Sequence, residues 1–261
     1  MMRPVCVLNR TVALGLIALA LSCTTLPAPA STTPSGTTPV ATAAATAPPT
    51  SDVCPPVRQL SLGAITGHLG YPSESIPALA LFAIRVDDPV AYRQLHTQRV
   101  PPGSSSYTMA AVEPGVYAVV AFVEGQSSAL AGAYTAAVVC GLGPSCNDHS
   151  AVPVTVRAGQ TVTGIDLTDW YTGVGAFPSR PAGSDALRPG DALRVCNPYA
   201  DSVNVRASAG LGFPVRRLLD NGTAVALRDG PLPADGLDWY EINIAGDQLA
   251  SGWVVGYALR K

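Results

Sequence analysis

In the C-terminal part of the chain, hydrophobic residues alternate with polar ones over short runs. Such runs cover residues 203–206, 212–215, 239–244 and 252–257, and glycine, asparagine or aspartate separates them. Short alternating runs between turn residues are typical of antiparallel strands. The pattern therefore predicts a small all-β barrel over residues 192–261.

The middle of the chain also alternates strand-like runs with turns. The run at residues 60–69 carries glycines, such as Gly67, where we expect a bulge or a close approach of two backbones. The run at 78–84 fits a strand or a short helix by its period, and the proline and aspartates beside it favour a buried strand. About seven short strands predict a β-sandwich over residues 57–171.

Two turn signals in this region predict hairpins. Pro114-Gly115 separates the run at 107–112 from the run at 116–122 and is typical of a type II turn. A turn at Gly159 separates two further apolar runs in the same way. We expect each pair of runs to form an antiparallel hairpin.

Three motifs stand out in the middle region. They are Gly63-x-Ile65-x-Gly67, Val112-x-Pro114-Gly115-x-Tyr117-x-Val119-x-Ala121 and Val154-x-Val156-x-Ala158-Gly159-Gln160. With these motifs, residues 58–169 resemble carboxypeptidase regulatory-like domains of the transthyretin (prealbumin) type, which are β-sandwich domains of secreted proteins. These are turn and core motifs, so they indicate a fold more strongly than an activity. The resemblance implies a non-catalytic accessory or adhesive module.

The C-terminal region contains five motifs in a characteristic order. They are Val203-Asn204-Val205-Arg206, Gly212-Phe213-Pro214-Val215, Asn221-Gly222-Thr223-x-Val225, Trp239-Tyr240-x-Ile242 and Gly252-Trp253-Val254. With these motifs, the chain resembles the bacterial SH3-like (SH3b) domain from residue 201 to the end. The resemblance implies binding of cell-wall peptide or glycan, or docking of a neighbouring domain. The chain departs from the family at residues 230–236 and 246–252, where we expect unusually long loops.

The alternation of residues 239–244 suggests where a ligand would bind. Tyr240 shares the apolar face of this run, and Trp239 falls on the polar face, where a large aromatic is a candidate stacking platform. Alternatively, Trp239 covers the edge of the barrel beneath residues 231–236. The candidate ligand-binding residues are Trp239, Tyr240, Arg206, Asn204 and Tyr199. We expect Trp253 to be structural.

The first residues have the features of an export signal. An apolar run at residues 11–21 is too short to span a bilayer, and residues 1–22 therefore read as a signal peptide. Leu19-Ala20-Leu21-Ser22-Cys23 resembles a lipobox, although Ala20 departs from its usual leucine. Cys23 is the candidate lipidation site, and ordinary cleavage after Ala30 is the alternative.

Two segments have the composition of linkers. Residues 23–56 are almost wholly threonine, proline, alanine and serine, and this composition predicts a disordered, extended stalk. The stalk is either glycosylated on its threonines or a plain spacer. Residues 172–191 are rich in glycine, proline and serine and predict a second linker.

The charge of the chain argues against nucleic acid as a partner. Charged residues make up 13% of the sequence, the net charge is −2, and the only lysine is Lys261. Nucleic-acid binding needs a concentrated basic surface, and the sequence does not predict one.

The six cysteines suggest an oxidising compartment. Cys6 falls in the signal peptide and Cys23 at the lipobox, which leaves an even number. The flexible Gly-Leu-Gly-Pro-Ser loop favours pairing of Cys140 with Cys146, and by elimination Cys54 then pairs with Cys196. A zinc site is the alternative, but no C-x-x-C spacing supports it.

Candidate catalytic residues are few. Asp148 and His149 form the most pocket-like polar pair, but neighbouring residues on a strand point in opposite directions, so we expect Asp148 to hold a loop. For Asp87-Asp88 we likewise favour a turn over a calcium site. The sequence contains no nucleophile elbow, metalloprotease motif or phosphate loop, so we expect no catalytic residues, no metal and no cofactor.

The sequence thus predicts a non-enzymatic, exported, all-β protein of the cell envelope, held to a membrane only by a lipid. The expected partner is cell-wall peptide or glycan, bound by the SH3-like module. The alternative is an accessory or inhibitory module that docks another envelope protein or a hydrolase.

Overall fold

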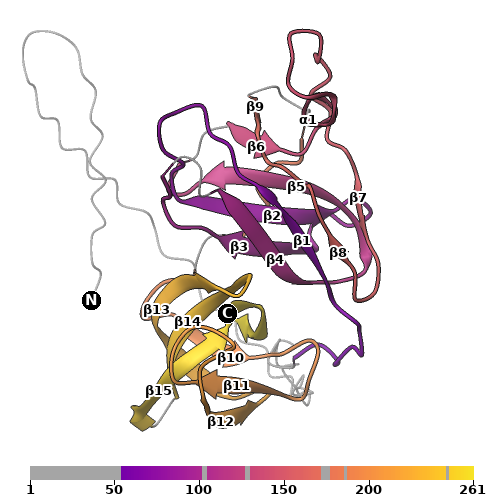
Figure 1. The fold of residues 1–261 in the computed structure, drawn as a ribbon. Coiled ribbons are helices and arrows are strands. Elements are labelled where there is room, and N and C mark those ends of the chain that lie inside the picture. Colours follow the sequence, from indigo (N-terminus) through magenta and orange to yellow (C-terminus); the bar gives the residue numbers. More distant parts are fainter. Residues whose placement is uncertain (1–53, 102–104, 127–129, 172–176, 185–186, 245–246) are drawn as a thin grey trace, which may run out of the picture. The chain divides into compact units, whose positions relative to one another are not determined.

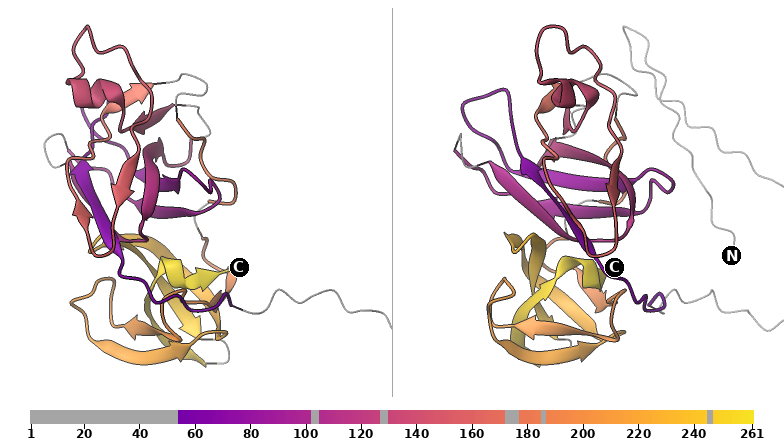
Figure 2. Two further views of the ribbon diagram at one scale, coloured as in Figure 1. Left: turned by 90° about the vertical axis from the view of Figure 1, so that its right-hand side faces the viewer. Right: turned by 45° about the vertical axis from the view of Figure 1, so that its right-hand side comes forward.

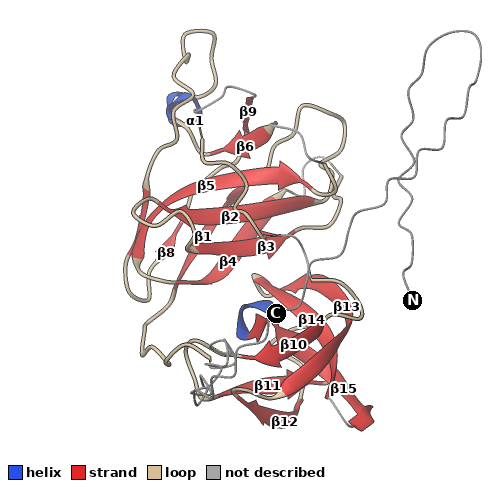
Figure 3. Cartoon of the chain, turned by 180° about the vertical axis from the view of Figure 1, so that it is seen from behind, coloured by secondary structure: helices blue, strands red, loops and turns tan. Residues whose placement is uncertain are grey.

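The computed structural model describes residues 54–101, 105–126, 130–171, 177–184, 187–244 and 247–261. Within these residues the protein is all-β, with several sheets and only two short helical segments (Figures 1 and 3). The predicted all-β class is confirmed. The predicted signal peptide, lipidation site and Thr/Pro stalk lie outside the described residues, apart from the last few residues of the stalk.

Two sheets form the region before residue 172, an arrangement compatible with a β-sandwich; we call them the sandwich sheets (Figure 2). The three-stranded sheet has the order β4 (Ser106–Val112), β1 (Gly63–His68) and β8 (Thr161–Val162). The other sheet has the order β3 (Tyr92–His96), β2 (Leu79–Arg85), β5 (Gly115–Val123), β6 (Ala131–Ala133) and β9 (Asp169–Tyr171), and β7 (Val154–Val156) pairs with β5.

The run at residues 78–84 is the buried strand β2, as predicted. Leu79, Leu81 and Ala83 pack in one core with residues of the three-stranded sheet, such as Met109. Phe82, by contrast, belongs to a second apolar cluster together with Val120 and Phe122. Because both faces of β2 are covered, its residues are apolar without alternation.

Phe177 packs against this second cluster, and the guanidinium of Arg180 lies 5.7 Å from the centre of the Phe82 ring. Part of the predicted linker at 172–191 therefore covers one face of the sheet.

Gly67 is required by a close approach of two backbones, as the sequence suggested. A Cβ at this position would lie 2.0 Å from the carbonyl oxygen of Ile165.

Both predicted hairpins are wrong. The strands on either side of Pro114-Gly115 belong to different sheets, since β4 pairs with β1 and β5 pairs with β2. The strands around Gly159 also separate, because β7 pairs with β5 and β8 runs parallel to β1. The turns do reverse the chain, but they carry it from one sheet to the other.

The C-terminal sheet contains seven strands in the order β12, β11, β15, β14, β13, β10 and β16. All of them pair antiparallel around one apolar core. Their bounds are β10 (Ala192–Val195), β11 (Ser202–Arg206), β12 (Val215–Asp220), β13 (Ala224–Ala234), β14 (Leu237–Ile244), β15 (Asp247–Val255) and β16 (Leu259–Arg260).

The long loop predicted at residues 230–236 is mostly strand. β13 continues through a register shift and the cis Gly230-Pro231 bond to Ala234, which pairs with Leu237. The reversal takes place at Asp235-Gly236, where both φ angles are positive, at 52° and 73°. This is the Asp-Gly pattern of a two-residue hairpin turn.

The stretched turn expected at 246–252 is also mostly strand, since β14 and β15 pair as far as Ile244 and Asp247.

The two helical segments are α1 (Ala136–Cys140) and η1 (Gly256–Ala258). The Thr135 side chain caps α1 by accepting a hydrogen bond from the backbone N–H of Val138. Within the described residues, no helix has the length and apolar character needed to cross a bilayer.

Both predicted disulfides are present. Cys140 pairs with Cys146, and Cys54 pairs with Cys196 across a sequence separation of 142 residues. The second bond ties the segment before β1 to the C-terminal sheet. Disulfides of this kind fit an oxidising compartment.

Candidate functional site

Trp239 does not form an exposed platform. Its side chain is 1% exposed, and its Nε1–H donates a 3.0 Å hydrogen bond to the Ala234 carbonyl in the hairpin formed by β13 and β14. Residues Leu237–Tyr240 are all buried, because both faces of β14 are covered at this end. Strand alternation therefore did not distinguish an exposed face, and the prediction of a stacking platform is corrected. Of the alternative, the structure supports the part that places Trp239 beneath residues 231–236, since the ring is bonded to Ala234 and lies in the apolar core.

The other predicted ligand residues divide into two groups. Asn204 and Arg206 lie on β11, where Asn204 is exposed and Arg206 Nη1 donates to the Phe213 carbonyl at 2.7 Å. Tyr199 and Tyr240 instead line one cavity of about 750 Å³. The five residues therefore do not form one site, although two of them line the same cavity. Trp253 is partly buried against the core, as expected of a structural residue.

This cavity, here called the interface cleft, lies between the sandwich sheets and the C-terminal sheet. Its walls combine tyrosines with basic side chains, and Glu113 and Asp238 are its acidic members. The aromatic and basic lining residues are Tyr92, Tyr117, Tyr199, Tyr240, Tyr257, Arg58, Arg85, Arg93, Arg260 and Lys261. The cleft thus combines aromatic rings with convergent charged groups, which can orient a polar ligand.

Arg93 projects from β3 and is fixed at two points. Its Nε–H donates to the Ala110 carbonyl at 3.0 Å, and its guanidinium lies 4.8 Å from the centre of the Tyr257 ring. Burial lowers the pKa of Arg93, and the nearby Asp238 carboxylate opposes that shift. The guanidinium therefore sits where water only partly solvates its charge.

A row of rings and cations continues from Arg93, with two tyrosine rings between two guanidinium groups. Tyr257 and Tyr199 meet edge to face with ring centres 5.4 Å apart, and the guanidinium of Arg58 lies 5.9 Å from the Tyr199 ring. Arg58 forms a two-point ion pair with Glu113, and Tyr199 donates its hydroxyl to the same carboxylate at 2.9 Å. Burial, followed by this hydrogen bond, raises the pKa of Tyr199.

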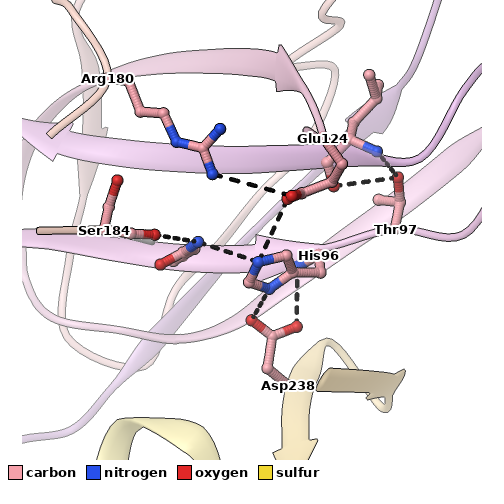
Figure 4. A network of polar contacts seen from close by, with 8 residues as sticks. His96, Thr97, Glu124, Arg180, Ser184 and Asp238 are labelled. Carbon is pink, nitrogen blue, oxygen red and sulfur yellow. Dashed lines mark hydrogen bonds and ion pairs between the residues drawn. The ribbon is translucent and has the colours of Figure 1, made fainter. Parts of the chain in front are cut away.

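The base of the cleft is held by a buried contact between β3 and β14 (Figure 4). Asp238 accepts hydrogen bonds from the His96 backbone N–H at 2.8 Å and from His96 Nδ1 at 2.7 Å. His96 Nε2 lies 3.3 Å from Glu124 Oε1, and Arg180 lies 3.9 Å from the other oxygen of that carboxylate. The network therefore joins both sheets to the segment that contains Arg180.

Further bonds fix the two walls of the cleft against each other. The Ala110 N–H on β4 donates to the Gly236 carbonyl at the tip of the β13–β14 hairpin, at 2.9 Å. The Arg58 N–H donates to the Pro198 carbonyl at 2.8 Å, beside the Cys54–Cys196 disulfide. Because these bonds lie around the cleft, its shape is formed before a ligand enters.

The candidate catalytic residues have structural partners. Asp148 accepts a hydrogen bond from the Ser150 N–H at 2.9 Å, so it holds the loop after Cys146 as predicted. His149 Nδ1 lies 2.8 Å from Asp169 Oδ2. Asp88 accepts from the Val90 N–H in a turn.

Within the described ranges, no cluster of three or more His, Cys, Asp or Glu side chains is placed to hold a metal ion. All four cysteines in these ranges are in disulfides.

Comparison of the chain with protein-family models, curated proteins and solved structures gives no match. The site therefore has to be judged from its own geometry.

Sequence reasoning missed Arg93 and Tyr257, the central pair of the cleft. The two residues are 164 positions apart, with Arg93 on β3 and Tyr257 in η1, and neither belongs to a motif. The one local signal was Tyr92-Arg93-Gln94, a polar and aromatic run on a short strand. That run alone does not predict which side chains of the C-terminal region contact Arg93.

Proposed function

We propose that this chain is an exported, non-enzymatic binding protein of the cell envelope, which takes up cell-wall peptide or glycan in the interface cleft. The observation that carries the proposal is the row of rings and cations formed by Arg93, Tyr257, Tyr199 and Arg58. Tyrosine rings stack on sugars and on peptide groups, and arginines bind their acidic substituents. The proposed ligand site is therefore the interface cleft and not the outer face of β14, where the sequence placed it.

Two features of the sequence support the setting of this function. The sandwich sheets and the C-terminal sheet would be a carboxypeptidase regulatory-like domain and an SH3-like barrel, displayed on the Thr/Pro-rich stalk. Cys23 would carry a lipid that anchors the stalk to the outer side of the membrane. Replacing Cys23→Ser should release the protein from membranes, and unchanged partitioning would refute the anchor.

Co-sedimentation with purified cell wall tests the binding function. The mature protein should pellet with the wall, and Tyr257→Ala should weaken pelleting because it removes the ring that supports Arg93. Arg157→Gln is a suitable control, since Arg157 is exposed in the turn between β7 and β8. Wild-type protein that stays in the supernatant would exclude wall binding.

A second candidate function is docking to another envelope protein. It is favoured by exposed apolar side chains on and just before β12, the edge strand of the C-terminal sheet. These residues are Leu211, Phe213, Val215 and Leu218, each 45–61% exposed. Edge strands with apolar side chains readily accept another chain. If this candidate is correct, Leu218→Asp should abolish partner binding while Tyr257→Ala leaves it intact.

A further inference from the structure

Among the cations of the interface cleft, Arg93 is distinguished by its unused hydrogen-bonding groups. Arg58 pairs with Glu113, Arg85 with Asp87 and Lys261 with Asp191. Arg260 donates from Nη1 to the carbonyls of Tyr257 and Leu259. Arg93 uses only Nε, and in the described part of the chain its two terminal nitrogens have no hydrogen-bond acceptor and no ion pair.

The orientation of Arg93 suits an incoming anion. One face of the guanidinium is near the Tyr257 ring and Nε is bonded to Ala110, so the group has little freedom to turn. An arginine held in this way presents its remaining N–H groups as a preformed fork, which matches the two oxygens of a carboxylate. Partial burial strengthens such a pair relative to one in water.

The acidic residues of the cleft limit the charge that a ligand can carry. Three of the five basic lining residues already have acidic partners, because Arg58 pairs with Glu113, Arg85 with Asp87 and Lys261 with Asp191. Asp238 is bonded to His96, and its nearby carboxylate also offsets part of the Arg93 charge, so a second negative charge on the ligand would meet repulsion. A single carboxylate fits this balance better than a doubly charged phosphate.

We propose that the interface cleft selects ligands by a single carboxylate, held by the fork of Arg93, with the body of the ligand against Tyr257 and Tyr199. This inference rests on the proposed function, because it takes the cleft as the ligand site. It adds the chemical class of the ligand: a peptide end or an acidic sugar, and not a neutral glycan.

The test compares two probes that differ only in the carboxylate. N-acetyl-Ala-Ala, with a free carboxylate, and its C-terminal amide are titrated into the full mature chain by NMR. The acid should bind about 10-fold or more tightly than the amide, as expected for hydrogen bonds to a charged group. Equal binding of acid and amide by the wild-type protein would overturn the proposal, and so would inorganic phosphate that binds as tightly as the acid.

Substitutions at Arg93 then assign the effect. Arg93→Gln should remove the preference for the acid, and Arg93→Lys should keep part of it, because lysine retains the charge but loses the fork. Arg157→Gln, at an exposed arginine away from the cleft, should behave as wild type. A preference for the acid that persists in a folded Arg93→Gln protein would contradict the role of Arg93. If this variant does not fold, the comparison of acid and amide with the wild-type protein still tests the carboxylate selectivity.

The two proposals fail in different ways. Wall binding that depends on Tyr257 but shows no preference between acid and amide would refute the carboxylate and leave the binding function. A preference for the acid without any wall binding would refute the wall-binding function and leave the carboxylate selectivity of the cleft.

Discussion

His96 and Asp238 form the central buried contact between the sandwich sheets and the C-terminal sheet. One Asp238 oxygen accepts from the His96 backbone and the other faces His96 Nδ1 at 2.7 Å, and both residues are at most 7% exposed. The contact orients β3, and β3 carries Arg93. The geometry of the interface cleft therefore depends on a hydrogen bond that lies behind it.

Asp238→Ala should destabilise the protein and loosen the cleft. It leaves two buried donors of His96 without acceptors, which costs about 1–3 kcal/mol for each unsatisfied group. Urea unfolding measures the loss, and Asp201→Asn, at an exposed aspartate just before β11, is the control. Stability equal to that of the control would show that the contact does not hold the two sheets together.

Trp239→Ala should act on stability and only indirectly on binding. The side chain is among the largest of the fully buried residues, and removing such a ring typically costs about 3–5 kcal/mol. Trp239→Phe, which keeps most of the volume, should fold and retain ligand binding. A well-folded Trp239→Phe protein that no longer binds would restore the direct ligand role that its burial argues against.

Alkaline pH should destabilise the protein through its buried tyrosines. Burial raises the pKa of Tyr107 and Tyr199 above the unfolded value of about 10. The folded state therefore retains protons that the unfolded state releases, and stability should fall as pH rises above about 10. Melting temperatures from about pH 8 to about pH 11 measure this fall, which should be shallower in Tyr199→Phe. An identical slope in that variant would argue that Tyr199 ionises as freely as in the unfolded chain.

Removing the Cys54–Cys196 bond should cost more stability than removing Cys140–Cys146. A disulfide constrains the unfolded chain more when it closes a longer loop, and the sequence separations here are 142 and 6 residues. The Cys54→Ser/Cys196→Ser variant should lose about 2–4 kcal/mol of unfolding free energy, measured with urea. A larger loss on removing the short bond would contradict this order.

The strands and the disulfides were accessible from the sequence because they depend on local information. Alternating apolar runs marked most strands, and the short loop between Cys140 and Cys146 fixed the first pairing and, by elimination, the second. The pairing partner of each strand could not be predicted from the sequence. Pro114-Gly115 marks a turn, but a turn does not show whether the next strand pairs with the preceding one or joins the facing sheet.

The candidate site shows the same division. The alternating pattern predicted an exposed Trp239 because such a pattern implies that one face of the strand contacts solvent. At this end of β14, neither face contacts solvent. The cleft depends on Arg93 and Tyr257, which meet only after two sheets have packed, and no period or motif encodes that meeting. Tyr199 and Tyr240 line the cleft, whereas the sequence assigned them to a different surface, and their ligand-binding role stays a prediction.

The most direct test of the interface cleft is hydrogen exchange of the full mature protein with and without soluble cell-wall fragments. We predict that protection on binding is greatest in β3, around Arg93, and in the segment from Gly256 to Lys261. Protection confined to β11 and β12, or none at saturating fragment, would contradict the assignment of the ligand site to the cleft.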